Sequence, residues 1–157
     1  MALTTYALLK TTIANYLNRT DLTSYLGDFI TLTESRMNRE LRVTDTTTTT
    51  VAGTQSYSLP SGFLEASAVI YQSNPYRTLR FMANGDFYRQ YNVTQTSGLP
   101  TFFTIVGENI LLGVAPDSAQ TLQIDFYKTI TALSESNTTN TILTNYPELY
   151  LYGALAE

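Results

Sequence analysis

Hydrophobic residues in the first forty positions recur at helical spacing. Tyr6, Leu9, Ile13 and Leu17 follow one another at three- or four-residue steps, which predicts a helix capped by Thr4 or Thr5. Residues 18–21 interrupt the pattern, and Thr20 or Asp21 is the predicted cap of a second helix. The buried stripe of that helix is formed by Leu22, Leu26, Phe29, Ile30, Met37 and Leu41. A turn this short predicts a helical hairpin.

The polar side of the second helix carries alternating charges. The pattern places Glu34, Arg36, Arg39, Glu40 and Arg42 on this side. Arg36 and Glu40 are four residues apart, so we expect a surface ion pair between them that stabilises the helix by a few tenths of a kcal/mol.

From Thr44 the period changes from helical to two, which predicts strands. The change begins with a threonine run at 46–50, whose β-branched side chains favour extended backbone. Clear alternation follows at 64–71 and at 121–130, with further strands predicted at 77–82, 102–106 and 110–114. Turns are expected at 73–75, 107–109 and 115–118, and a short helix at 84–91.

The end of the sequence returns to helical spacing. A polar loop is expected at 134–140, and Pro147 with Glu148 reads as the first turn of a helix that continues through Leu149, Tyr152 and Leu155. Because no Gly, Asn or basic residue closes this helix before Glu157, we expect the natural protein to be longer.

These patterns predict an α+β fold. An N-terminal helical hairpin (1–43) and a C-terminal loop and helix (134–157) form a helical layer. An antiparallel β-sandwich or barrel-like domain of about seven strands (44–133) is inserted between them. We expect one compact unit overall, since 157 residues are enough for one hydrophobic core.

Composition narrows the possible chemistry. The chain contains no Cys and no His, which excludes disulfides, thiolate zinc sites and imidazole catalysis. Only 14% of the residues are charged, and the net charge is −4. An acidic balance opposes non-specific binding to nucleic acid backbones.

Motifs for catalysis or cofactor binding are missing from the sequence. Acid–base chemistry would have to use Asp or Glu, and no pair of carboxylates stands out. The phosphate-binding and calcium-binding signatures are also absent. We therefore predict a protein that is not an enzyme, with no catalytic, cofactor-binding or metal-binding residues.

One basic segment is interleaved with aromatic residues. Arg77, Arg80 and Arg89 lie near four aromatic side chains, as in some nucleic-acid sites. In an acidic chain, three arginines in this arrangement are better interpreted as a mixed surface or a partner interface. The neighbouring aromatic residues are Tyr76, Phe81, Phe87 and Tyr88.

Several segments, taken in order, resemble the head-to-tail adaptor (connector) proteins of tailed bacteriophages. The third of them contains Glu34, Arg36 and Arg39 in an acidic-x-Arg-x-x-Arg pattern that closes the second helix in that family. The segments in the first half of the chain are 3–10 (LTTYALLK), 13–22 (IANYLNRTDL), 28–42 (DFITLTESRMNRELR) and 57–65 (YSLPSGFLE). Those in the second half are 98–100 (GLP), 112–116 (LGVAP) and 143–155 (LTNYPELYLYGAL).

The resemblance implies a non-enzymatic virion protein. Such a protein forms a homo-oligomeric ring, usually of twelve copies, that binds the portal protein and offers a seat for tail or nozzle proteins. It joins the capsid to the tail and lets DNA pass through its lumen during genome ejection without specific binding. The expected location is the neck of the virion, after synthesis in the host cytoplasm, with no membrane partner and no cofactor.

Protein contacts in such a ring need interface residues. Arg36, Arg39 and Arg42 are the predicted contacts with the portal or a neighbouring copy, together with Tyr150 and Tyr152, because Arg and Tyr are favoured at interfaces. An alternative remains open, in which the arginines only pair with Glu34 and Glu40 on a solvated face. Two other functions also remain open: a β-rich tail or binding module that recognises host saccharide, and a carboxylate-dependent cell-wall hydrolase.

Overall fold

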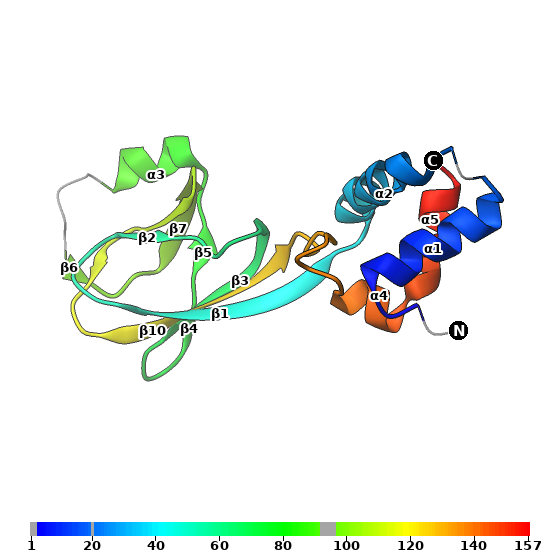
Figure 1. Ribbon diagram of the computed structural model, residues 1–157. Helices are drawn as coiled ribbons and strands as arrows, with labels where there is room; N and C mark the ends of the chain where they lie inside the picture. The colour runs from blue at the N-terminus through cyan, green and yellow to red at the C-terminus, as the bar shows by residue number, and fades with distance from the viewer. Residues whose placement is uncertain (1–2, 20, 92–96) are drawn as a thin grey trace. The chain divides into compact units, whose positions relative to one another are not determined.

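The computed structural model describes residues 3–19, 21–91 and 97–157 (Figure 1). These residues group into two compact units, the helical unit (1–43 and 129–157) and the β unit (44–128). The helical unit combines helices from both ends of the chain, and the β unit is built mainly of strands. The predicted α+β class, with helices at both ends and antiparallel sheets between them, is confirmed.

The first helix forms where the sequence predicts it. Helix α1 covers Tyr6–Leu17 and buries Tyr6, Leu9 and Ile13. Of the two predicted caps, Thr5 is the one used, since its side chain accepts a hydrogen bond from the Leu8 N–H. The helix ends at Asn18, whose φ of 49° places it in the left-handed region that Asn tolerates at helix ends.

The second helix begins later than predicted. A 3₁₀ turn, η1 (Thr23–Tyr25), precedes α2 (Leu26–Glu40), and neither Leu22 nor Tyr25 makes a side-chain cap bond. Asp21, a predicted cap, instead accepts hydrogen bonds from Arg19, one of them at 2.9 Å from Nε. Thr20, the other predicted cap, lies outside the described residues. The 3₁₀ turn occupies the place of the expected first helical turn.

The C-terminal segment contains two helices, of which one was predicted. Helix α5 covers Pro147–Leu155 and has Pro147 in its first turn, as expected. Helix α4 (Thr141–Asn145) was not predicted, although Asn140 gives a local signal because its side chain accepts from the Leu143 N–H at 2.8 Å. Its five residues are too few to show a periodic stripe.

The core of the helical unit unites both ends of the chain. Its most deeply buried side chains are Leu9, Ile13, Leu26, Ile30, Leu143 and Tyr150. Helix α5 approaches α2 so closely that a Cβ atom at Gly153 would overlap the Cγ2 methyl group of Thr33. Thr33 is itself buried, with its hydroxyl donating to the Phe29 carbonyl at 2.9 Å. Gly153 is therefore required by helix packing.

The β unit contains two four-stranded sheets. The first has the order β1 (Val43–Val51), β10 (Gln120–Lys128), β3 (Phe63–Gln72), β4 (Arg77–Thr78). The second has the order β2 (Ser56–Ser58), β8 (Asn109–Leu112), β7 (Phe102–Val106), β5 (Arg80–Phe81). A further pair joins β6 (Ser97–Gly98) to β9 (Ala115–Pro116), and helix α3 covers Asn84–Gln90, within the predicted range.

One core fills the space between the two sheets. Strand β10 follows the alternation predicted at 121–130, since every second side chain, Leu122, Ile124 and Phe126, is buried. Strand β3 departs from strict alternation because its pairing with β10 skips Ser67, which shifts the inward face to Val69 and Tyr71. A β-bulge of this kind is invisible in the hydrophobic pattern.

The β unit has more strands than expected. The described residues form ten strands, whereas the sequence predicts about seven. Four of the ten, β4, β5, β6 and β9, have only two residues each, which is too short for an alternating pattern to show. Two of the short pairings, β5 with β7 and β6 with β9, are parallel. The predicted hairpin between β7 and β8 is present, with Gly107 at a φ of 60° in its two-residue turn. Within the described ranges no sheet closes into a barrel.

We expect Gly153→Ala to destabilise the helical unit by about 1–3 kcal/mol, because the new Cβ atom overlaps the Thr33 side chain. This cost exceeds the ~1 kcal/mol by which the higher helix propensity of Ala would stabilise α5. Urea unfolding followed by circular dichroism measures the change. Gly85→Ala in α3 is the matched control, since its Cβ would meet no atom within 4 Å. Adding Thr33→Ser to Gly153→Ala removes the overlapping methyl group and recovers stability. A Gly153→Ala chain as stable as wild type contradicts the tight contact.

Candidate protein interface

The arginines predicted as interface residues lie on or just after α2. Arg36 and Arg39 are exposed, and Arg36 forms an ion pair with Glu157 at 2.6 Å in place of the predicted pair with Glu40. Arg42 is also exposed and follows the helix. An exposed ion pair contributes little to stability, so the Arg36–Glu157 pair leaves Arg36 available for other contacts.

An apolar side chain joins two of these arginines on one helical stripe. Leu32, Arg36 and Arg39 stand at positions i, i+4 and i+7 of α2, and Leu32 is 52% exposed. Arginine is enriched at protein contacts, and the exposed Leu adds apolar area beside it. Sequence reasoning missed Leu32 because an isolated apolar residue on a polar face carries no periodic signal. We call these three residues the α2 stripe.

The two tyrosines predicted as interface residues have opposite environments. Tyr152 is 63% exposed on α5, near the exposed Leu149. Tyr150 is completely buried, so in this arrangement its side chain has no surface to offer another protein. Its structural role replaces the predicted contact. The sequence pattern missed this because both tyrosines belong to one short apolar helix with no clear polar face.

Tyr150 belongs to a buried polar network centred on Glu34. The Glu34 carboxylate accepts hydrogen bonds from the Leu133 N–H at 2.8 Å and from the Tyr150 hydroxyl at 3.0 Å. Asn140 donates to the same hydroxyl at 2.6 Å. Glu34 is 5% exposed, so its predicted place on the polar side of the second helix is wrong, as is its predicted pairing with surface arginines.

Burial controls the ionisation of this network. Loss of water raises the pKa of the Glu34 carboxyl above its ordinary value of 4.5, and the hydrogen bonds from Leu133 and Tyr150 oppose the rise. Burial is also the main cause that raises the pKa of Tyr150, with the negative charge of Glu34 adding to it. The carboxyl is therefore more easily protonated in the folded chain than in the unfolded one.

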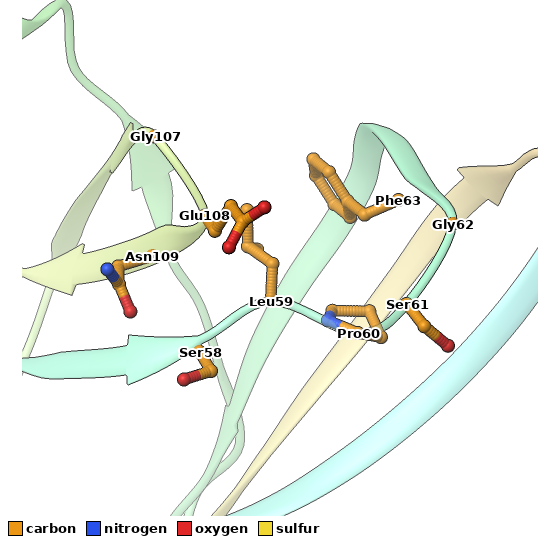
Figure 2. A pocket seen from close by; sticks show the side chains of 9 residues that line it. All are labelled: Ser58, Leu59, Pro60, Ser61, Gly62, Phe63, Gly107, Glu108 and Asn109. Atoms are coloured by element: carbon orange, nitrogen blue, oxygen red, sulfur yellow. The ribbon is translucent and has the colours of Figure 1, made fainter.

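The β unit has a surface hollow where two loops meet. It encloses about 540 Å³ between residues 58–63 and 107–109 (Figure 2). The Leu59 N–H donates to the Glu108 carbonyl at 2.9 Å, which holds the loops together. The lining of the hollow includes one carboxylate, that of Glu108, whereas glycoside hydrolysis uses two carboxylates. The hollow thus lacks the acid–base pair required by the hydrolase hypothesis.

The described residues contain no cluster suited to a metal ion and no helix suited to a membrane. No group of three or more Asp or Glu side chains comes together in a way that could hold a metal ion. Within the same ranges, every helix is too short or too polar to cross a membrane.

We expect Glu34→Gln to remove a pH dependence of folding. Because the folded chain binds a proton more tightly at Glu34, wild-type stability falls as the pH rises from about 4.5 through the raised pKa. Gln keeps the accepting oxygen but cannot ionise, so this decline should disappear. Unfolding free energies measured by urea titration between pH 4 and 8 test this.

Glu34→Ala is the contrasting variant. It leaves the Leu133 N–H without its acceptor and removes one partner of Tyr150, so we expect a loss of about 2–3 kcal/mol near pH 4. The loss becomes smaller at higher pH, because the stability of the wild-type chain itself declines there. Equal pH profiles for wild type and Glu34→Gln would contradict the raised pKa. Equal stabilities of Glu34→Ala and wild type would contradict the network.

Comparison with known proteins gives the identity of the family. No curated protein matches the chain. The family model described as SU10 adaptor protein matches residues 4–157, which include both units and the α2 stripe. This match confirms the resemblance found in the sequence motifs. The chain belongs to the SU10 adaptor protein family, a family of phage head-to-tail adaptors.

Proposed function

We propose that this protein forms a ring beneath the portal, where it joins the capsid to the tail and lets DNA pass. The observation that carries the proposal is the family match over residues 4–157. A phage adaptor is a structural protein of the virion neck that works with portal and tail components. Ring formation, portal binding and DNA passage are the parts that extend beyond the family assignment.

The surface chemistry of the helical unit supports a protein-binding role. The α2 stripe combines an exposed Leu with two exposed Arg side chains, and Tyr152 adds an exposed aromatic ring on α5. Arg and Tyr are enriched at protein interfaces because they combine large contact area with hydrogen bonding. We assign the α2 stripe, Arg42 and Tyr152 to contacts with the portal or with a neighbouring copy.

The net charge supports the passage of DNA. Each copy carries −4, so a ring of copies has a strongly negative total charge. Like charge weakens non-specific attraction between the ring and the phosphate backbone. In this role the protein needs shape and charge but no catalytic group.

Gold-labelled antibodies against the protein should bind the neck of the virion, between head and tail, in negative-stain electron micrographs. The reason is that an adaptor remains in the finished particle at this position. Particles treated with pre-immune antibodies are the control. Label at the tail tip would instead support the saccharide-binding alternative, and an unlabelled neck in opened particles would contradict the proposal.

Arg39→Glu should weaken binding to the portal protein at least tenfold, because it reverses a charge in the α2 stripe. Arg89→Glu is the matched control, since Arg89 is also an exposed Arg in the last turn of a helix, α3, but lies in the β unit. Biolayer interferometry with immobilised portal protein gives both dissociation constants. Equal losses for the two variants would show a general charge effect and remove the α2 stripe from the interface.

A further inference from the structure

A basic hollow lies at one edge of the β unit. It encloses about 430 Å³ and is lined by Arg77, Thr78, Arg80, Pro100, Thr101 and Phe102. Arg77 belongs to β4, the last strand of one sheet, and Arg80 to β5, the last strand of the other. Two arginines from different sheets therefore line one hollow, which we call the arginine hollow.

The positive charge of this hollow is not neutralised within the described residues. Neither Arg77 nor Arg80 forms an ion pair there, whereas the other two basic residues of the β unit are paired, Arg89 with Asp86 and Lys128 with Asp45. The Nε atom of Arg77 is buried and donates no hydrogen bond. The hollow thus offers donors that no acceptor of the β unit occupies.

The chemistry of the lining favours a carboxylate as the missing acceptor. Guanidinium groups bind carboxylate and phosphate through paired hydrogen bonds. A phosphate backbone is the weaker choice, because nucleic-acid sites use longer runs of basic residues and this chain has a net charge of −4. Phe102 and Pro100 add an apolar wall that suits the methylene groups of an acidic side chain.

Among the described residues of the β unit, one carboxylate shows no side-chain partner. Three aspartates of the β unit have partners: Asp45 pairs with Lys128, Asp86 pairs with Arg89, and Asp117 accepts a hydrogen bond from the Ser118 hydroxyl. Asp125 accepts from Thr46, and Glu65 also has an interaction partner. Glu108 is exposed, and no side-chain partner for it occurs among the described residues. It therefore matches the arginine hollow in charge and availability.

The two features lie at opposite ends of one strand. Arg80 pairs with Phe102 at the start of β7, and Glu108 lies in the turn after Val106, where β7 ends. The four residue steps of strand from Phe102 to Val106 span roughly 13 Å, and the turn places Glu108 beyond that end of the strand. Glu108 is thus too far away to fill the hollow of its own copy. Complementary patches at separate places on one protein produce head-to-tail contacts between copies.

We propose that Glu108 of one copy binds in the arginine hollow of the next copy. This inference rests on the ring proposed above and assigns the contact that builds it. Each copy then offers one acidic turn and one basic hollow, so the contact repeats from copy to copy. A repeated contact of this kind closes into a ring when its rotation permits.

A charge exchange in the full-length chain tests the contact. Arg80→Glu and Glu108→Arg should each lower the self-association constant at least tenfold, because like charges then meet. The double variant Arg80→Glu/Glu108→Arg restores opposite charges and should recover association to within about threefold. Sedimentation velocity at low salt measures all three, and Arg89→Glu, which changes a charge outside the hollow, should associate as wild type does.

Disulfide cross-linking tests the head-to-tail geometry. Because the chain has no native cysteine, only the introduced cysteines can form a cross-link. Thr101→Cys lies beside the hollow and Asn109→Cys beside Glu108. Under mild oxidation the double variant should give a ladder of covalent oligomers, while each single variant remains monomeric on a denaturing gel. A dimer formed by either single variant would show a two-fold contact and overturn the inference.

Three other results would overturn it. These are a wild-type chain that stays monomeric at its highest soluble concentration, single reversals that leave association unchanged, and a double variant that does not recover. Weaker binding of duplex DNA by Arg80→Glu with unchanged self-association would assign the hollow to phosphate. Because neck labelling does not depend on Arg80 or Glu108, a labelled neck with a failed charge exchange would reject this contact and keep the proposed adaptor.

Discussion

The carboxylate of Glu34 holds the two ends of the chain in one helical unit. It comes from α2 and accepts hydrogen bonds from Leu133, just before the C-terminal helices, and from Tyr150 on α5. Removing a carboxylate from water costs several kcal/mol unless donors converge on it. The backbone at Leu133 and the ring of Tyr150 must therefore keep their places beside α2. The contact of Gly153 with Thr33 then sets how closely α5 approaches.

Both units combine charges that are paired within one copy with exposed charges for which the described residues show no ion pair. In the helical unit the buried acid is satisfied internally, and surface charges such as Lys10 and Glu135 form ion pairs. Among the described residues of the β unit, the charges without an ion pair or side-chain partner lie in the arginine hollow and at Glu108. Unpaired charges at defined positions contribute nothing to the stability of a single copy. They are useful when another molecule supplies the opposite charge.

Membership of an adaptor family agrees with the chemistry that this chain contains. The chain contains no Cys and no His, so thiol and imidazole chemistry are not among its properties. The α2 stripe offers one contact surface, and the β unit offers a second contact based on charge. A protein that only has to hold its neighbours and leave a passage open needs no more than such surfaces. Family membership and surface chemistry thus support the same role by independent arguments.

Local patterns in the sequence determined the longer helices, the main strands and the α+β class, because backbone preference and hydrophobic period act over a few residues. Helix α1 and strand β10 follow their patterns closely. The motifs also identified the family. Only the tertiary structure decided which individual polar residues are buried. Glu34 looked like a surface acid, and Tyr150 like an interface residue, because the donors and walls around them come from segments about a hundred residues apart. For the same reason only the sheet pairing, which places β4 and β5 at neighbouring edges, brings Arg77 and Arg80 to one hollow and sets Glu108 at the far end of β7.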